Sequence, residues 1–147
     1  MGESRSEPAP RDFPSVREYP EGAHTAAQAA AAIGVEVGQI VKSLLFVRDD
    51  RPLLVLCSGA NQVDEAALGV TKARADDVRA ATGMAIGGVA PYGHPEPLET
   101  LVDEDLLRYD VVWAAAGTPR HVFPIAPDDL VARTRGRIER IALNRAS

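Results

Sequence analysis

The amino-acid sequence predicts one domain of the mixed α/β (α+β) class, with helices packed around a mixed β-sheet. Residues 25–34 hold an alanine-rich run with capping residues at both ends, which is typical of a helix. Two nearly continuous apolar runs, 39–47 and 53–57, are typical of strands covered on both faces. Helices and strands then follow in irregular order, which favours a mixed sheet over a strict βαβ array.

The helix near the N-terminus is the most clearly specified element. Thr25 stands at the N-cap position, Gln28 lies three residues on as in a capping box, and Gly34 is a stop signal. A short strand over 16–19 is expected before this helix. A turn signal at 49–52 joins the two apolar runs, so we expect an antiparallel hairpin.

The remaining elements are shorter and are separated by glycine and proline signals. They are a helix over 63–68, a helix over 75–82, strands over 98–102 and 111–116 with a helical turn over 103–109 between them, a strand over 121–125, a helix over 127–134 and a last strand over 137–143. Pro124 cannot donate a hydrogen bond to a neighbouring strand, so its strand is expected at an edge or a bulge.

The size and composition indicate one globular domain. A chain of 147 residues with 46% hydrophobic and 25% charged residues can bury one core. No apolar run approaches the ~20 residues that cross a bilayer, so no membrane contact is expected. Residues 1–14 carry charges and prolines but no signal-peptide core, so we expect a flexible tail, a domain over 15–147 and a cytoplasmic protein.

Charge and cysteine content exclude several function classes. A net charge of −5 argues against a broad phosphate-binding face, so DNA binding is not expected and any contact with RNA should be local. Cys57, the single cysteine, lies in an apolar run and is expected to be a packed thiol. His24, His94 and His121 lack metal-ligand spacing, and nucleotide-binding fingerprints are absent, so neither a metal nor a cofactor is expected.

A glycine- and proline-rich segment, 82–95, interrupts the regular elements. Gly87 and Gly88 permit unusual backbone angles, and Pro91 fixes its own, so 87–91 should be a shaped loop presenting main-chain groups. Such a loop either holds a ligand through its amides or is a tight turn between strands. The residues alone leave both open.

Three further positions could carry chemistry. Lys42 lies inside an apolar strand, where it either reaches solvent at the strand edge or faces a cleft as a fixed cation for a phosphate or an oxyanion. His94 is either an acid–base group or a solvated loop residue. The small residues around Gly117 permit the close approach of a ligand or of another segment.

Taken in order, four features resemble the YbaK/prolyl-tRNA synthetase editing-domain family: the Thr25 to Gly34 helix, the Lys42 strand, the 82–91 segment and the small residues before Gly117. The resemblance covers about 16–143. It implies a single α/β domain with a mixed, partly barrel-like sheet. It also implies a trans-editing deacylase that hydrolyses the ester of a mischarged tRNA, substrate-assisted and without a metal.

The resemblance also implies roles for individual residues. The lysine matching Lys42 helps to hold the terminal adenosine, and the loop matching 87–91 fixes the aminoacyl carbonyl through backbone amides. Both suit the physical properties described above. We therefore expect two catalytic residues, Lys42 and Gly87, and five substrate-binding residues, Thr25, Gly88, Pro91, His94 and Gly117.

Departures from the family pattern leave the edited amino acid open. Ser43 stands where alanyl-specific members tend to have Asn, and 116–118 differs from the Ser-Gly-Gly of cysteinyl-type members. The expected partner is the acceptor end of an aminoacyl-tRNA, delivered by a synthetase or an elongation factor. The alternatives are a binding module for aminoacyl-tRNA or aminoacyl-adenosine that lacks the chemistry, and a hydrolase of other small acyl esters.

Overall fold

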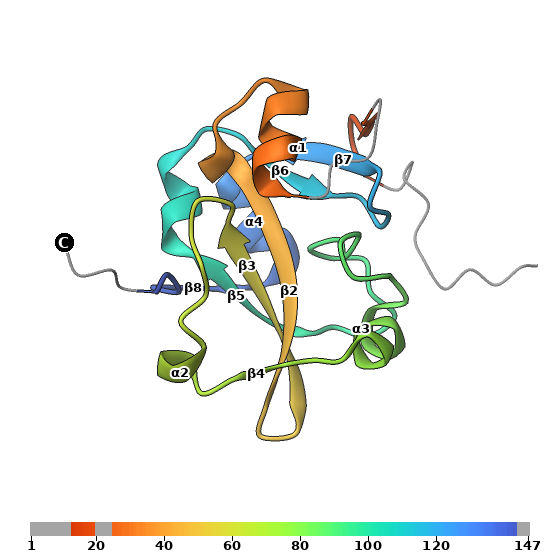
Figure 1. Ribbon diagram of the computed structural model, residues 1–147, viewed down its shortest axis with the longest axis vertical. Coiled ribbons are helices and arrows are strands. Elements are labelled where there is room, and N and C mark those ends of the chain that lie inside the picture. The colour runs from red at the N-terminus through yellow and green to blue at the C-terminus, as the bar shows by residue number, and fades with distance from the viewer. Residues whose placement is uncertain (1–12, 20–24, 144–147) are drawn as a thin grey trace, which may run out of the picture.

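The computed structural model describes residues 13–19 and 25–143, which form one mixed sheet with helices around it (Figure 1). The strands are β1 (Arg17–Glu18), β2 (Ile40–Arg48), β3 (Arg51–Ser58), β4 (Thr71–Lys72), β5 (Glu99–Asp103), β6 (Val112–Ala115), β7 (His121–Ile125) and β8 (Arg137–Glu139). The helices are α1 (Ala26–Ile33), η2 (Val37–Gln39), α2 (Glu65–Leu68), α3 (Ala75–Thr82), η3 (Glu104–Arg108) and α4 (Pro127–Thr134).

The sheet runs in the order β1-β7-β6-β2-β3-β5-β8, and β4 pairs with β2 outside this path. The pairs β2–β6, β3–β5 and β5–β8 are parallel, and the others are antiparallel. β2 crosses the middle of the molecule as its longest strand (Figure 1). The predicted fold class, a mixed sheet with packed helices, is confirmed.

Helix α1 begins and ends where the capping residues predict. The Thr25 hydroxyl accepts from the Gln28 main-chain N–H at 3.0 Å, and the Gln28 side chain accepts from the Thr25 N–H at 3.1 Å. Gly34 closes the helix in the left-handed region at φ 91°, which glycine adopts without strain. No helix in the described part of the chain is long and apolar enough to cross a membrane.

The predicted hairpin of β2 and β3 is confirmed, with a tighter turn than expected. Asp49 and Asp50 alone form it, both at positive φ, so Arg51 and Pro52 belong to β3. A two-residue turn with both φ values positive matches the right-handed twist of the strands it joins. The two-residue strand β4 and the 3-10 helix η2, which takes Gln39 from the expected strand, were not predicted.

The last predicted strand is too long. β8 ends at Glu139 rather than at residue 143, because the chain then leaves the sheet and Ala142 bridges Val63 near α2. Pro124 lies where the sequence predicts, since β1 pairs with β7 only at His121 and Val122 and so leaves Pro124 on an open edge. The sheet can therefore accept a residue that lacks an N–H donor.

Two apolar clusters cover opposite faces of the central hairpin. One contains Val41, Leu45 and Phe123, and the other contains Phe46 and Val55. Alternate residues of a strand point to opposite faces, so the continuous apolar runs of β2 and β3 follow from burial on both sides.

Phe13 packs with the domain, although it lies in the segment predicted as a tail. Its ring stacks on Phe123 at 4.8 Å between centroids and contacts Tyr92 at 5.2 Å. The rest of the predicted tail up to residue 12, and His24, lie outside the described residues.

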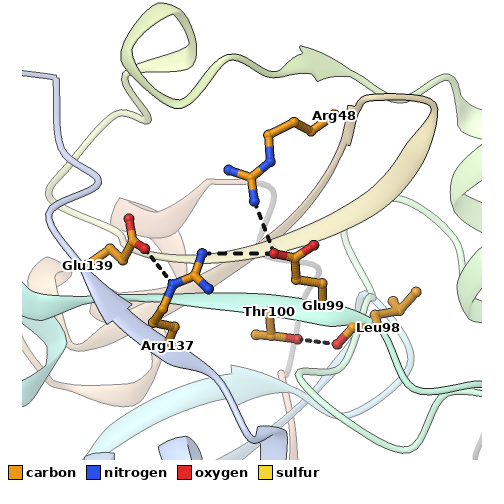
Figure 2. Close-up of polar contacts among 6 residues, drawn as sticks. All are labelled: Arg48, Leu98, Glu99, Thr100, Arg137 and Glu139. Atoms are coloured by element: carbon orange, nitrogen blue, oxygen red, sulfur yellow. Dashed lines mark hydrogen bonds and ion pairs between the residues drawn. The ribbon is translucent and has the colours of Figure 1, made fainter.

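A chain of ion pairs connects three strands on the outside of the sheet (Figure 2). Glu99 of β5 pairs with Arg48 of β2 at 3.0 Å and with Arg137 of β8 at 3.8 Å. Arg137 also pairs with Glu139 at 2.6 Å. We call these four residues the outer ion network; each of their charges meets an opposite charge within the protein.

Candidate functional site

The edge of β2 that faces away from β3 is covered only in part. β6 pairs with Ile40 and Val41 at one end of β2, and β4 pairs with Phe46 and Val47 at the other. Among the described residues, no strand pairs with residues 42–45 on this side. We call this stretch the open edge of β2.

Ser43 lies in the middle of the open edge. The Leu45 carbonyl points away from β3, because it accepts from the Ala73 N–H at 3.2 Å. Main-chain groups two residues apart on a strand point the same way, so the N–H and C=O of Ser43 also face the gap. The Ser43 hydroxyl oxygen is buried and has no hydrogen-bond partner among the described residues. The open edge therefore holds polar groups that the protein itself does not satisfy.

A cavity of about 720 Å³ lies at this edge, which is within the ~300–1,000 Å³ typical of small-molecule sites. Its walls come from β2, β4, β6, β7, α1, α2, α3 and loop residues that include Gln62, Ile86, Gly87 and Val89, and they are largely apolar. The charged or titratable side chains in the lining are Lys42, Lys72, Glu65, His121 and Tyr19. A cavity with few polar groups and an open strand edge suits a ligand that is held mainly by shape and main-chain contacts.

Lys42 lines this cavity and is half-buried on β2. Its ammonium donates a hydrogen bond to the main-chain carbonyl of Asn61. Of the two alternatives that the sequence left open, the lysine faces a cleft. A carbonyl partner is neutral, so the positive charge of Lys42 stays available to a ligand.

Asn61 is itself fixed by two carboxylates. Its side-chain amide donates to Asp103 at 2.9 Å and to Asp105 at 2.8 Å. Asp103 is fully buried and accepts two further bonds, from the main-chain N–H of Ser58 at 3.0 Å and that of Asp105 at 2.9 Å. A buried carboxylate is stable in a fold when it accepts several hydrogen bonds, as this one does.

Cys57 lies beside Lys42 and Asn61 and is fully buried. Burial raises the pKa of its thiol to about 12, against a smaller opposing effect of the nearby Lys42 charge. The thiol is therefore neutral near pH 7, as expected for the packed thiol that the sequence predicts.

The glycine-rich loop approaches the cavity at Gly87. This residue is exposed at φ 91°, and a Cβ built there would meet no atom within 4 Å. A Cβ at Gly88, by contrast, would lie 2.6 Å from the carbonyl carbon of Thr118 and 2.7 Å from the nitrogen of Pro119. Gly88 is thus needed for close packing of two loops, and Gly87 for the backbone angle at the cavity.

The predicted site residues separate into two groups. Thr25, Lys42 and Gly87 line the cavity. The other four, Gly88, Pro91, His94 and Gly117, are not part of its lining.

His94 has a structural partner of its own. Its Nε2 lies 2.7 Å from the carbonyl oxygen of Ala90 and donates to it. Burial lowers the pKa of His94 below its usual value, so the ring is neutral near pH 7. Neutral His94 holds the loop by this bond and does not line the cavity, so its role in substrate binding stays a prediction.

Sequence analysis missed an aromatic wall of the cavity. Tyr19 and Trp113 line it, and the Arg17 guanidinium lies 4.8 Å from the centre of the Trp113 ring. Aromatic rings with an adjacent arginine suit the flat face of a nucleobase. The sequence signal was weak, because Trp113 is the single tryptophan in an ordinary apolar strand. Among the described residues, no group of three or more His, Cys, Asp or Glu side chains is placed to hold a metal.

Together the fold and the cavity define a class of protein: a mixed α/β protein whose candidate site combines Lys42, an open strand edge and a glycine loop. Comparison with known sequences identifies the family. The sequence model of the aminoacyl-tRNA editing domain matches residues 20–132. The chain belongs to this family, which confirms the resemblance seen in the sequence.

Similar proteins include two of comparable length. The chain is 33% identical over 122 residues to "Uncharacterized protein YwhH" of Bacillus subtilis (strain 168), with 78% of each chain covered. It is 26% identical over 127 residues to "Putative Cys-tRNA(Pro)/Cys-tRNA(Cys) deacylase EbsC" of Enterococcus faecalis, with 80% of this chain and 77% of the relative covered.

A solved structure has the same fold. It is described as the "Crystal structure of a putative trans-editing enzyme for prolyl tRNA synthetase", with a TM-score of 0.82 at 45% identity, and the match covers 88% of this chain and 86% of that one. The chain also matches proline–tRNA ligases such as that of Lactobacillus gasseri at 34% identity, but spans only 19% of that ligase.

Proposed function

We propose that this protein is a trans-editing deacylase that hydrolyses the ester between an amino acid and the 3′-terminal adenosine of a mischarged tRNA. The observation that carries the proposal is the cavity in which Lys42 and Gly87, the two residues expected to act on the ester, lie beside the open edge of β2. The family and the names of the similar proteins support the same activity.

The proposed chemistry relies on positioning. The Lys42 ammonium binds the terminal nucleotide, and Tyr19 and Trp113 flank its base. The main-chain N–H groups of Gly87, Val89 and Ser43 hydrogen-bond the carbonyl oxygen as it gains negative charge. Those of Gly88 and Ala90 already donate to Ala85 and Met84. A water oxygen bonds to the carbonyl carbon, the carbon–oxygen bond to the ribose breaks, and the ribose oxygen takes a proton. The other ribose hydroxyl of the substrate helps to activate the water or the leaving group.

A protein nucleophile is not part of this proposal. The buried Cys57 thiol, with a pKa of about 12, is neutral and unsuited to attack. His94 is engaged with Ala90 and does not line the cavity. Hydrolysis should therefore persist in the presence of EDTA, because no step is assigned to a metal.

The proposed partner is the acceptor end alone. A net charge of −5 argues against a broad phosphate-binding face for the whole tRNA, so a synthetase or an elongation factor that already binds the tRNA would deliver the substrate. This arrangement fits the trans-editing description of the similar solved structure.

The test is deacylation of tRNAs charged with Ala, Cys, Ser, Thr or Pro. Purified wild-type protein should hydrolyse one or a few of these esters, and Lys42→Ala should slow hydrolysis by about 100-fold or more. Arg137→Ala is the matched control, because it removes one positive charge outside the cavity. Wild-type rates in a folded Lys42→Ala variant would contradict the proposal.

A non-catalytic binding module for aminoacyl-adenosine is the second candidate. It is favoured by one observation: the cavity lining holds charged and aromatic side chains suited to binding, and the one cysteine, beside Lys42, is a buried neutral thiol. A stable amide analogue of aminoacyl-adenosine would then raise the melting temperature while no ester is hydrolysed.

A further inference from the structure

Lys42 lies near two carboxylates, but its hydrogen-bond partner is a neutral main-chain carbonyl. Asp103 and Asp105 are close enough to Cys57, the cross-strand neighbour of Lys42, to act on its pKa. The Lys42 ammonium nevertheless donates to the neutral main-chain carbonyl of Asn61. The two carboxylates instead accept hydrogen bonds from the Asn61 side chain.

The choice of a carbonyl rather than a carboxylate as the partner of Lys42 has an electrostatic consequence. A carboxylate in direct contact would neutralise Lys42 and would compete with an anionic ligand for it. A carbonyl holds the ammonium in place without neutralising it, so the positive charge can attract an anionic ligand in the cavity. The Asn61 amide separates the negative charges from Lys42 and gives both of its N–H groups to them, which keeps it from turning away.

The position of the Asn61 carbonyl is fixed from several directions. Its own N–H donates to the Ser58 carbonyl at 2.9 Å, which closes the turn after β3. The Ser58 hydroxyl donates to the Gly38 carbonyl at 2.8 Å, and the Ser58 N–H donates to Asp103 at 3.0 Å. The side-chain clamp and the turn therefore orient one carbonyl oxygen toward Lys42.

We propose that Asn61 is a positioning residue for Lys42: the clamp of its side chain by Asp103 and Asp105 aims its main-chain carbonyl at the ammonium and holds the cation at the cavity. The contribution of this clamp to hydrolysis rests on the function proposed above. The positioning itself can be tested without any activity.

The first experiment uses the fact that the chain has only two lysines, Lys42 and Lys72. Wild-type protein and Asn61→Ala are acetylated with a limiting amine-directed reagent, and mass spectrometry gives the ratio of Lys42 to Lys72 modification. Asn61→Ala keeps the carbonyl but deletes the clamp, so Lys42 should become more reactive relative to Lys72 by about tenfold. An unchanged ratio would overturn the proposal.

Two further variants separate positioning from stability. Asp64→Ala removes the N-cap of α2 in the same loop, where Asp64 accepts from Ala67 at 3.1 Å, and leaves the Lys42 contact in place. It should lower the melting temperature without changing the lysine ratio. Asn61→Ser removes the amide clamp but leaves one short hydroxyl donor, so it should raise the ratio in the same direction by less, even if Asn61→Ala folds poorly.

The second experiment is a double-mutant cycle on deacylation. If Asn61 acts through Lys42, Asn61→Ala should lower kcat/KM about tenfold in the wild-type background and have almost no effect in the Lys42→Ala background. Equal losses in both backgrounds would overturn the role in the reaction, because a merely structural residue would produce them. If wild-type protein hydrolyses no ester, the proposed function fails, and the acetylation ratio still decides whether Asn61 positions Lys42.

Discussion

The open edge of β2 and the outer ion network are both polar regions of the same sheet, and β2 takes part in each. In the outer ion network every charge meets an opposite charge, as Glu99 does with Arg48 and Arg137. At the open edge, among the described residues, the Ser43 hydroxyl is buried without a partner and no strand pairs with 42–45 on the side away from β3. The charges of the outer ion network are paired, whereas the Ser43 hydroxyl at the open edge has no partner among the described residues.

The difference favours the open edge over the outer ion network as the place for a ligand. Exposed ion pairs are partly hydrated and contribute little to the free energy of unfolding. Unsatisfied polar groups in an enclosed place cost stability, so a fold retains them where a bound molecule completes them. Substitutions at the open edge should therefore change activity more than stability, and substitutions in the outer ion network should change little of either.

After Lys42→Ala, the next largest expected effect at the cavity comes from Gly87→Ala. The new methyl group meets no atom within 4 Å, but φ 91° is strained for alanine by ~1 kcal/mol. The loop should relax away from the cavity, and kcat/KM for deacylation should fall about tenfold or more. Gly34→Ala is the matched control, because Gly34 has the same φ and open space at the end of α1. Equal activity in both variants would show that the loop does not act on the substrate.

Ser43→Ala tests whether the hydroxyl at the open edge is without a partner. No hydrogen bond is lost, so the free energy of unfolding should stay the same or rise by up to ~1 kcal/mol. Ser58→Ala provides the contrast, because its buried hydroxyl donates to Gly38 at 2.8 Å and its loss should cost ~1–3 kcal/mol. Urea denaturation measures both, and similar losses in the two variants would contradict the comparison.

The pH dependence of stability tests the loop that faces the open edge. Burial lowers the pKa of His94 in the folded protein, so the unfolded chain binds a proton first as the pH falls through ~6.5. The contribution of neutral His94 is present above that pH and is lost below it. Wild-type protein should therefore lose more stability between about pH 7.5 and about pH 5.5 than His94→Gln does. Parallel pH profiles of the two proteins would show that His94 does not titrate in this way.

Much of the fold was predictable because its signals are local. The capping box of Thr25 and Gln28 and the turn at Asp49 and Asp50 act over a few residues, and the structure places the helix and the hairpin there. β4 was missed because two residues carry no periodic pattern, and its pairing with β2 depends on the tertiary fold.

The site was predictable in part for the same reason. Lys42 stands out as a charge within an apolar strand, and Gly87 stands out in a glycine-rich loop. The Asn61 side chain bonds to Asp103 and Asp105, which lie 42 and 44 positions further along the chain. The open edge of β2 depends on where two other strands, β4 and β6, end. Neither leaves a pattern that a single sequence can show, because both arise from contacts between distant segments.

The smallest expected effect belongs to the outer ion network. Glu99→Gln removes the charge shared by Arg48 and Arg137, but the Glu99 side chain is 48% exposed and already well hydrated. The free energy of unfolding should fall by less than ~0.5 kcal/mol, and the loss should shrink further as salt screens the pair in wild-type protein. Deacylation should be unchanged. Urea denaturation at low and high salt, with one kinetic assay, measures all three. A loss above ~1.5 kcal/mol, or a slower reaction, would mean that the network supports the cavity through β2, and the separation of the two regions would fail.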